Sequence, residues 1–195
     1  MPPTDNSLML EIIEESRMTP DLDASVREIL AECFPASAEK FSGRRAWYLL
    51  PPLFSVVYCR DEEVVAHAAI VPRLLSPSDA CSGLQSDGVT TASIHGVSVG
   101  PQHRGLGLSR QLLRTAVAEA RHRGFDFGIL FCQPELEGFY NDLGWRRAPH
   151  KVVILDREGV VASPMTSRSF PMYIELASRP FPDSPLFMRR GDERS

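Results

Sequence analysis

The chain has 195 residues, of which 43% are hydrophobic and 24% charged, and its formal net charge is −4. This composition is typical of a globular protein with one core. The absence of a basic excess argues against nucleic acid as the main partner. A membrane is also not expected as the main partner, because no apolar run approaches 20 residues. The N-terminus lacks the features of a secretory signal and the four cysteines form no metal or redox motif, so the simplest expectation is a cytoplasmic protein.

The first part of the chain predicts a strand, a capped helix and an irregular connection. Residues 8–13 have the apolar content of a strand. Thr19 is placed as an N-cap with Pro20 at the first helical position, and Pro35 stops the helix because proline lacks the N–H group that a helix interior needs. An apolar stripe at helical spacing gives this helix one buried face. We expect residues 36–50 to form a short helix followed by a loop.

A β-hairpin and a polar loop come next. Residues 54–60 and 64–71 have the composition of two paired strands, and the polar residues 61–63 form the turn between them. Residues 76–88 are rich in Ser, Asp, Gly and Pro, which is typical of a loop. The hairpin therefore supplies two neighbouring strands to a sheet.

The stretch from Ile94 to Arg123 predicts a strand, a glycine-bearing turn and a long amphipathic helix in direct succession. Gly100 and Pro101 stop the strand, because proline cannot donate to a sheet ladder and glycine weakens one. The helix places leucine and alanine on one face and arginine and glutamate on the other. Gly124 follows as the C′ residue that ends the helix.

The remaining elements complete a mixed α/β chain. Residues 125–131 predict a strand, 134–143 a short helix, 145–155 another strand, 156–169 a loop and 170–177 the last strand. We expect the tail, residues 178–195, to be irregular because it is charged and punctuated by proline. Strands and helices interleave around the central strand–turn–helix, which indicates a mixed α/β (α+β) domain of three layers.

Gly105 and Gly107 stand directly before the central helix, an arrangement that suits a phosphate group. Glycines let a ligand approach the main chain, and a helix N-terminus adds N–H donors and about half a positive charge. The same pattern fits an ordinary strand–helix connection, so alone it leaves both readings open. A Walker A loop does not fit because no Gly-Lys-Ser/Thr follows, and a dinucleotide fingerprint does not fit because its third glycine would fall at Arg110.

Two blocks together resemble the GNAT acyltransferase superfamily. The run VSVGPQHRGLGLS at residues 97–109 is similar to motif A, V-x-V-x-P-x-x-R-G-x-G-x-[GAS], and GFYNDLGW at residues 138–145 resembles the later F-Y-x-x-L-G-[FW] signature. The resemblance implies a single GNAT domain over residues 1–195, with a central, mostly antiparallel twisted sheet flanked by helices. It also implies acetyl-CoA as the acyl donor, bound at the central strand–turn–helix.

The resemblance assigns the CoA-binding residues by position. The backbone of Val97 and Val99 would bond the pantetheine arm. The pyrophosphate would lie in the turn, held by Arg104, Gly105, Gly107, Leu108 and Ser109. No metal site is expected, because the remaining histidines (His103, His122 and His150) lack the spacing of metal ligands.

Two residues are candidates for proton transfer. Tyr140 aligns with the tyrosine that protonates the leaving thiolate in many GNAT enzymes; the alternative is a core tyrosine with a structural hydrogen bond. His95 is the candidate base, because an ordinary histidine with a pKa near 6.5 can take a proton at neutral pH. The alternative is a strand histidine satisfied by a neighbouring carbonyl. Regular strand alternation would place His95, Val97 and Val99 on one face.

Two further residues with reactive side chains fit the core better than a site. His67 lies in the second hairpin strand, where the simpler reading is a buried core histidine. Cys132 lacks a local base motif, so the simpler reading is a buried residue at the end of a strand rather than a nucleophile.

The acyl acceptor is left open between several classes. The run VAHAAIVPRLL at residues 65–75 resembles the aminoglycoside 2′-N-acetyltransferase branch, although His95 stands where those enzymes carry an acidic residue, and nodulation-type N-acyltransferases are similar more loosely. We expect a primary amine of a small polar molecule, attacked directly in a ternary complex. A protein or peptide amine, or a CoA-binding module without turnover, are the alternatives, and a homodimer is compatible with either enzyme.

Overall fold

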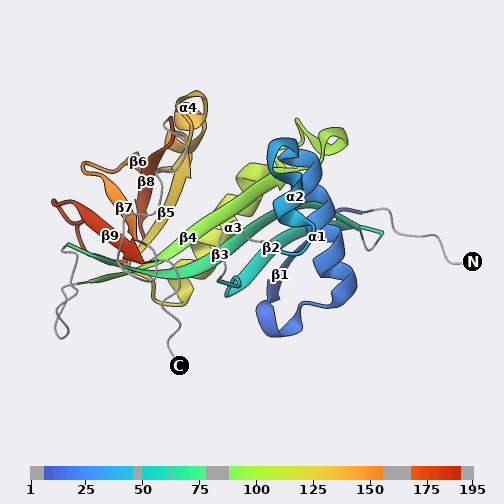
Figure 1. The fold of residues 1–195 in the computed structure, drawn as a ribbon, viewed down its shortest axis with the longest axis horizontal. Coiled ribbons are helices and arrows are strands. Elements are labelled where there is room, and N and C mark those ends of the chain that lie inside the picture. Colours follow the sequence, from blue (N-terminus) through green and yellow to red (C-terminus); the bar gives the residue numbers. More distant parts are fainter. Residues whose placement is uncertain (1–6, 46–49, 62, 78–87, 156–167, 190–195) are drawn as a thin grey trace, which may run out of the picture. The chain divides into compact units, whose positions relative to one another are not determined.

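The computed structural model describes residues 7–45, 50–61, 63–77, 88–155 and 168–189 (Figure 1). The strands are β1 (Met9–Glu14), β2 (Phe54–Arg60), β3 (Glu63–Ser76), β4 (Val89–Val99), β5 (Phe127–Cys132), β6 (Arg146–Arg147), β7 (Val152–Leu155), β8 (Phe170–Glu175) and β9 (Leu186–Arg189). The helices are α1 (Pro20–Cys33), α2 (Ala38–Phe41), α3 (Leu108–His122) and α4 (Glu137–Asn141).

The chain divides into two compact units. One consists of residues 1–71 and 94–116, and the other of residues 72–93 and 117–195. Strands β3 and β4 and helix α3 therefore each contribute residues to both units. The expectation of one domain over residues 1–195 stays a prediction.

In the first unit, α1 packs on one face of the strands β1-β2-β3-β4, of which β1, β2 and β3 pair antiparallel (Figure 1). The helix begins as predicted at Thr19, whose hydroxyl oxygen accepts the Leu22 N–H at 3.3 Å. Its apolar face meets the sheet in a cluster of buried residues: Val26, Ile29, Leu30, Phe41, Val57, Cys59 and Val64. Burial of this face is what holds α1 on the sheet, because a helix of this length is marginal alone.

Helix α3 begins on the opposite face of the same strands. The hydroxyl of Tyr58 on β2 donates a hydrogen bond to Gln111 of α3. Its neighbour Val57 belongs to the α1 cluster, and successive strand residues point to opposite faces. The start of α3, which carries the predicted phosphate-binding turn, is thus fixed to the sheet by its own contacts.

In the second unit, β5 lies between a parallel and an antiparallel partner. It pairs parallel with β4 (Thr91 opposite Phe127) and antiparallel with β8, which also pairs with β6. The end of β3 pairs antiparallel with β9, and β9 pairs parallel with β7. A buried cluster joins these strands: Leu75, Val89, Phe127, Ile129, Leu186 and Met188. Across both units, antiparallel pairs predominate, as expected.

The predicted end of α3 is confirmed. Gly124 has a φ of +79°, and Phe125 N–H donates to the carbonyl of Ala120 at 3.2 Å. This left-handed residue directly after the last turn is the glycine C-cap that the sequence indicates.

Two predicted boundaries are wrong. The segment 170–177 is not the last strand, because β9 follows it inside the tail that the sequence predicts to be irregular. Leu186 and Met188 of β9 are buried, and β9 pairs with β3 and β7. The predicted strand 145–155 is split into β6 and β7, and Pro149 lies between them, where a residue without an N–H group cannot extend a ladder. The loops predicted over residues 76–88 and 156–169 lie largely outside the described residues.

No helix among the described residues is both long and apolar enough to cross a bilayer.

Gly128 on β5 should tolerate no larger residue. A Cβ at this position would lie 2.8 Å from Cγ2 of Ile174 and 3.0 Å from Cη2 of Trp145. We expect Gly128→Ala to lower the free energy of unfolding by about 1–3 kcal/mol, the usual cost of overpacking. Urea unfolding measures it. The matched control is Gly138→Ala in α4, where a Cβ meets no atom of the described chain within 4 Å; equal stability of the two variants would contradict the packing argument.

Candidate functional site

The turn before α3 is open and left-handed at both glycines. Gly105 and Gly107 have φ values of +80° and +75°, and a Cβ on either would meet no atom of the described chain within 4 Å. The carbonyl of Gly107 accepts the first helical N–H groups, so those of Leu108 and Ser109 precede the hydrogen-bonded part of α3. Donors at a helix start, beside a space that side chains leave open, suit a phosphate.

Val99 links the end of β4 to this turn. Its carbonyl oxygen accepts the Nε–H of Arg104 at 3.3 Å and the thiol of Cys33 on α1 at 3.4 Å. A carbonyl has two lone pairs, so both acceptor positions are occupied. A pantetheine bond to Val99 would therefore have to use its N–H group. Arg104 itself is exposed, and its guanidinium also interacts with the thiol of Cys33.

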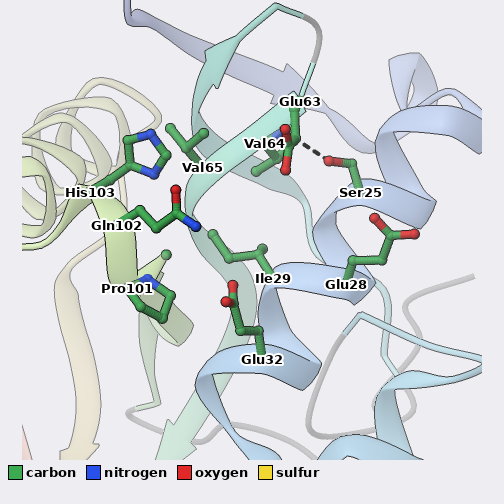
Figure 2. A pocket seen from close by; sticks show the side chains of 11 residues that line it. Ser25, Glu28, Ile29, Glu32, Glu63, Val64, Val65, Pro101, Gln102 and His103 are labelled. Atoms are coloured by element: carbon green, nitrogen blue, oxygen red, sulfur yellow. Dashed lines mark hydrogen bonds between the residues drawn. The ribbon is translucent and has the colours of Figure 1, made fainter.

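A cavity of about 440 Å³ lies between α1, the start of β3 and the residues that follow β4 (Figure 2). Its walls carry the carboxylates Glu28, Glu32 and Glu63, with Gln102 and His103 on the other side. Carboxylates repel phosphate, so this cavity does not suit the pyrophosphate of CoA, although it adjoins the glycine turn in sequence. The cavity could not be predicted from the sequence, because its acidic residues come from separate segments of the chain.

The strand segment around His95 is not regular. Gly96 has a φ of +60°, and a Cβ there would lie 3.0 Å from Cδ2 of Leu30 on α1. A left-handed residue interrupts the alternation of a strand. The regular alternation on which the predicted shared face of His95, Val97 and Val99 depends is therefore interrupted at Gly96. His95, Gly96 and Val97 are all half-buried.

His67 is a core residue, as predicted, but a fully hydrogen-bonded one. It has no exposed surface. Its Nδ1 lies 3.2 Å from the carbonyl oxygen of Gly96 and its Nε2 lies 3.3 Å from Oγ of Ser55. Burial lowers the pKa of His67 to about 4; the hydrogen bond to Gly96 opposes this and the charge of Arg45 adds to it. The imidazole is therefore neutral at physiological pH.

This depressed pKa predicts a loss of stability in acid. Below pH 6.5 the unfolded chain protonates His67 while the folded chain does not, so the stabilisation is complete above pH 6.5 and is lost as the pH falls toward 4. We expect the free energy of unfolding of the wild type to fall by about 3 kcal/mol more than that of His67→Asn between pH 7 and pH 4. Urea unfolding at these two pH values measures the difference; parallel pH profiles would contradict it.

Tyr140 lies in the second unit, buried on α4. Only 7% of it is exposed, and its ring packs edge-on against Trp145 at 6.3 Å between centroids. Burial raises the pKa of Tyr140 to about 12, with a smaller contribution from Cys132. The hydroxyl thus keeps its proton throughout the neutral range, as a proton donor must. The other predicted site residues all belong to the first unit.

The described cysteines are free; Cys59 and Cys132 are buried, and Cys33 is half-buried. Cys132 is buried and lies 3.3 Å from the sulfur of Met172, and burial raises the pKa values of Cys59 and Cys132 to about 11. Cys81 lies outside the described residues. A thiol with so high a pKa is a poor nucleophile, which supports the reading of Cys132 as a core residue. Within the described ranges, no group of three His, Cys, Asp or Glu side chains is placed to hold a metal ion.

Residues 24–145 match the family model described as "Acetyltransferase (GNAT) family". The matched range contains the glycine turn, α3 and the block that carries Tyr140 and Trp145. It covers more than half of the chain.

Two curated proteins are similar over shorter stretches. The chain is 36% identical over 66 residues to serotonin N-acetyltransferase 2, chloroplastic, of Oryza sativa subsp. japonica, and 30% identical over 83 residues to an uncharacterized ycf52-like N-acetyltransferase of Prochlorococcus marinus. These matches cover 34% and 43% of this chain. They span 33% and 44% of the two relatives, less than half of either.

A solved structure shares the fold over nearly the whole chain. The GNAT family N-acetyltransferase YhbS of Escherichia coli, solved in complex with CoA, has a TM-score of 0.60 and 19% identity, and covers 97% of this chain and 93% of its own. The likeness confirms the expected architecture, a central, mostly antiparallel sheet flanked by helices.

Proposed function

The chain belongs to the GNAT family of acetyltransferases, and from this premise we propose that it is an acyl-CoA-dependent N-acyltransferase that moves an acetyl group from acetyl-CoA to a primary amine. The observation that carries the proposal is the turn before α3. Gly105 and Gly107 are left-handed and open to solvent, and the N-terminal N–H groups of a 15-residue helix follow them. A Cβ at either glycine would fill the space that a pyrophosphate needs.

We assign the pyrophosphate to the backbone of residues 105–109, with Arg104 as a charged partner, and the pantetheine arm to the backbone of Val97 and Val99. Acetyl-CoA, when bound, supplies a thioester carbonyl that an unprotonated amine can attack. An alkylamine is protonated at neutral pH, so a base has to remove its proton first. His95 would take that proton, a backbone N–H of β4 would stabilise the charge on the carbonyl oxygen, and the hydroxyl of Tyr140 would return a proton to the sulfur.

The acceptor we propose is the primary amine of a small polar molecule. The curated relative from Oryza sativa is named for serotonin, which is itself a small primary amine. The resemblance of residues 65–75 to aminoglycoside 2′-N-acetyltransferases adds aminoglycosides to the candidates. Two alternatives would replace this proposal. One is acetyl transfer to a protein or peptide amine, and the other is CoA binding without turnover.

Two measurements test the proposal. Calorimetry should show saturable binding of acetyl-CoA to the full chain, and a screen of arylalkylamines, polyamines and aminoglycosides should show release of the CoA thiol with at least one amine. Binding without thiol release from any amine, peptides included, would favour a module without turnover. Absence of binding would remove the proposal.

His95→Ala should reduce turnover in a pH-dependent way. We expect kcat to fall about 100-fold at pH 7, as is usual for loss of a general base, and the deficit to shrink toward pH 10, where the amine loses its proton unaided. The pH profile of kcat measures this. The control is His122→Ala, on an exposed position of α3. A His95→Ala profile parallel to that of the wild type would exclude His95 as the base.

A further inference from the structure

We propose that His67 is a positioning residue: its imidazole fixes the peptide between Gly96 and Val97 so that the N–H of Val97 is held ready for the acyl carbonyl oxygen. The inference rests on the proposed function, because it specifies which N–H of β4 stabilises the developing charge and what orients it. It joins two observations that sequence patterns do not connect, a buried histidine on β3 and a left-handed glycine on β4.

Because residue 96 is a glycine, the orientation of the Gly96–Val97 peptide has to be held by contacts from outside β4. Gly96 has a φ of +60°, and a Cβ there would lie 3.0 Å from Cδ2 of Leu30. Both features favour glycine here, yet glycine adopts positive and negative φ about equally readily. The φ preference of glycine alone therefore does not select the orientation of the Gly96–Val97 peptide. Something outside β4 has to select one orientation.

His67 is placed to make that selection. Its Nδ1 lies 3.2 Å from the carbonyl oxygen of Gly96. A carbonyl can only accept, so Nδ1 must carry the proton. A neutral imidazole then has a lone pair on Nε2, which accepts the hydroxyl of Ser55 at 3.3 Å. Both ring nitrogens are engaged, so one tautomer and one ring orientation are defined.

The consequence for Val97 follows from the geometry of the peptide bond. In a planar trans peptide the C=O and N–H groups point in opposite directions, and no described peptide bond is cis. Since the oxygen of Gly96 points toward His67 in the core, the N–H of Val97 points away from it. That N–H lies on the strand segment to which the pantetheine arm is assigned. Loss of an oriented donor to a developing oxyanion typically costs 10²–10³ in kcat.

A matched pair of amide variants separates positioning from packing. The side-chain nitrogen of His67→Asn reaches the position of Nδ1 and can still donate to Gly96, whereas that of His67→Gln reaches the position of Nε2 and meets Ser55 instead. We expect kcat of the Asn variant to stay within about 3-fold of the wild type and that of the Gln variant to fall 10- to 100-fold. The Kd for CoA should change less than 3-fold in both, because the glycine turn is untouched.

Equal loss of kcat in the two variants, or a smaller loss in the Gln variant, would mean that His67 only fills space and would overturn the inference. Should either variant fail to fold, the wild type provides a second readout. The ¹⁵N chemical shifts of labelled His67 at pH 7 should show the neutral tautomer protonated at Nδ1; the other tautomer or an imidazolium would overturn the inference as well. If the wild type transfers acetyl to no amine, the proposed function itself fails, and the positioning role falls with it.

Discussion

Replacement of Tyr140 by phenylalanine should lower kcat about 100-fold and leave the Kd for CoA unchanged. The variant removes one hydroxyl and keeps the ring that packs against Trp145 at 6.3 Å, so the fold should be preserved. Burial raises the pKa of this hydroxyl to about 12, and it therefore holds its proton at any pH where the enzyme works. Loss of a positioned proton donor typically costs 10²–10⁴ in rate. Steady-state kinetics with the best amine from the screen, together with calorimetry, measure both quantities.

Tyr173→Phe is the matched control. Tyr173 lies on β8 in the same unit, half-buried, with its ring stacked 4.0 Å from that of Phe181. Its hydroxyl has no role in the proposed reaction, so kcat should stay within about 2-fold. If Tyr140→Phe also kept full kcat, Tyr140 would be the core tyrosine that the sequence leaves as the alternative, and the thiolate would have to leave without its help.

Gly105→Val should weaken CoA binding at least 100-fold. Two effects act together. A β-branched residue at a φ of +80° is strained, and the new side chain would project into the open space where the pyrophosphate is expected. Gly43→Val is the control, because a Cβ at Gly43 also meets no atom of the described chain within 4 Å but its φ lies outside the left-handed region. Calorimetric titration with CoA measures the effect.

A shorter acyl donor distinguishes blocking of the pyrophosphate by the new side chain from backbone strain at residue 105. Acetyl-pantetheine lacks the pyrophosphate, so a side chain that only blocks the phosphate should leave kcat/KM for this shorter donor within about 3-fold of the wild type. A similar loss with both donors would indicate that strain has distorted the whole start of α3. Unchanged CoA affinity in folded Gly105→Val would refute the assignment of the turn.

The sequence predicts those parts of the fold that local rules decide. The cap at Thr19 and the glycine end of α3 at Gly124 follow from side-chain and backbone preferences within a few residues, and both are confirmed. The sequence does not predict strand β9, because the prolines and charges around it are typical of an irregular tail. What makes Leu186 and Met188 a strand is burial against β3 and β7, which are distant in the chain.

In the candidate site, too, features set by consecutive residues can be predicted from the sequence, whereas features set by contacts between distant segments cannot. The glycine turn can be predicted from the sequence, because its residues are consecutive and resemble a motif of the GNAT family, to which the chain belongs. Its role in CoA binding stays a prediction. The left-handed φ of Gly96 could not be read from the sequence, since glycine in a strand fits a regular ladder as well as an interrupted one. Neither could the bonds of His67 to Gly96 and Ser55, which depend on how three strands align. The roles of His95 and Tyr140 stay predictions.

The buried thiols decide how cleanly the reaction can be followed. Aromatic disulfide reagents respond to thiolates, and CoA released by acetyl transfer has an unhindered thiol in solution. Cys59 and Cys132, with pKa values near 11, are almost entirely protonated at pH 8, so each should react slowly with such a reagent while the protein stays folded. These two thiols should therefore add little to the colour that develops during turnover, and a rise in their reaction with the reagent would signal that the core has opened.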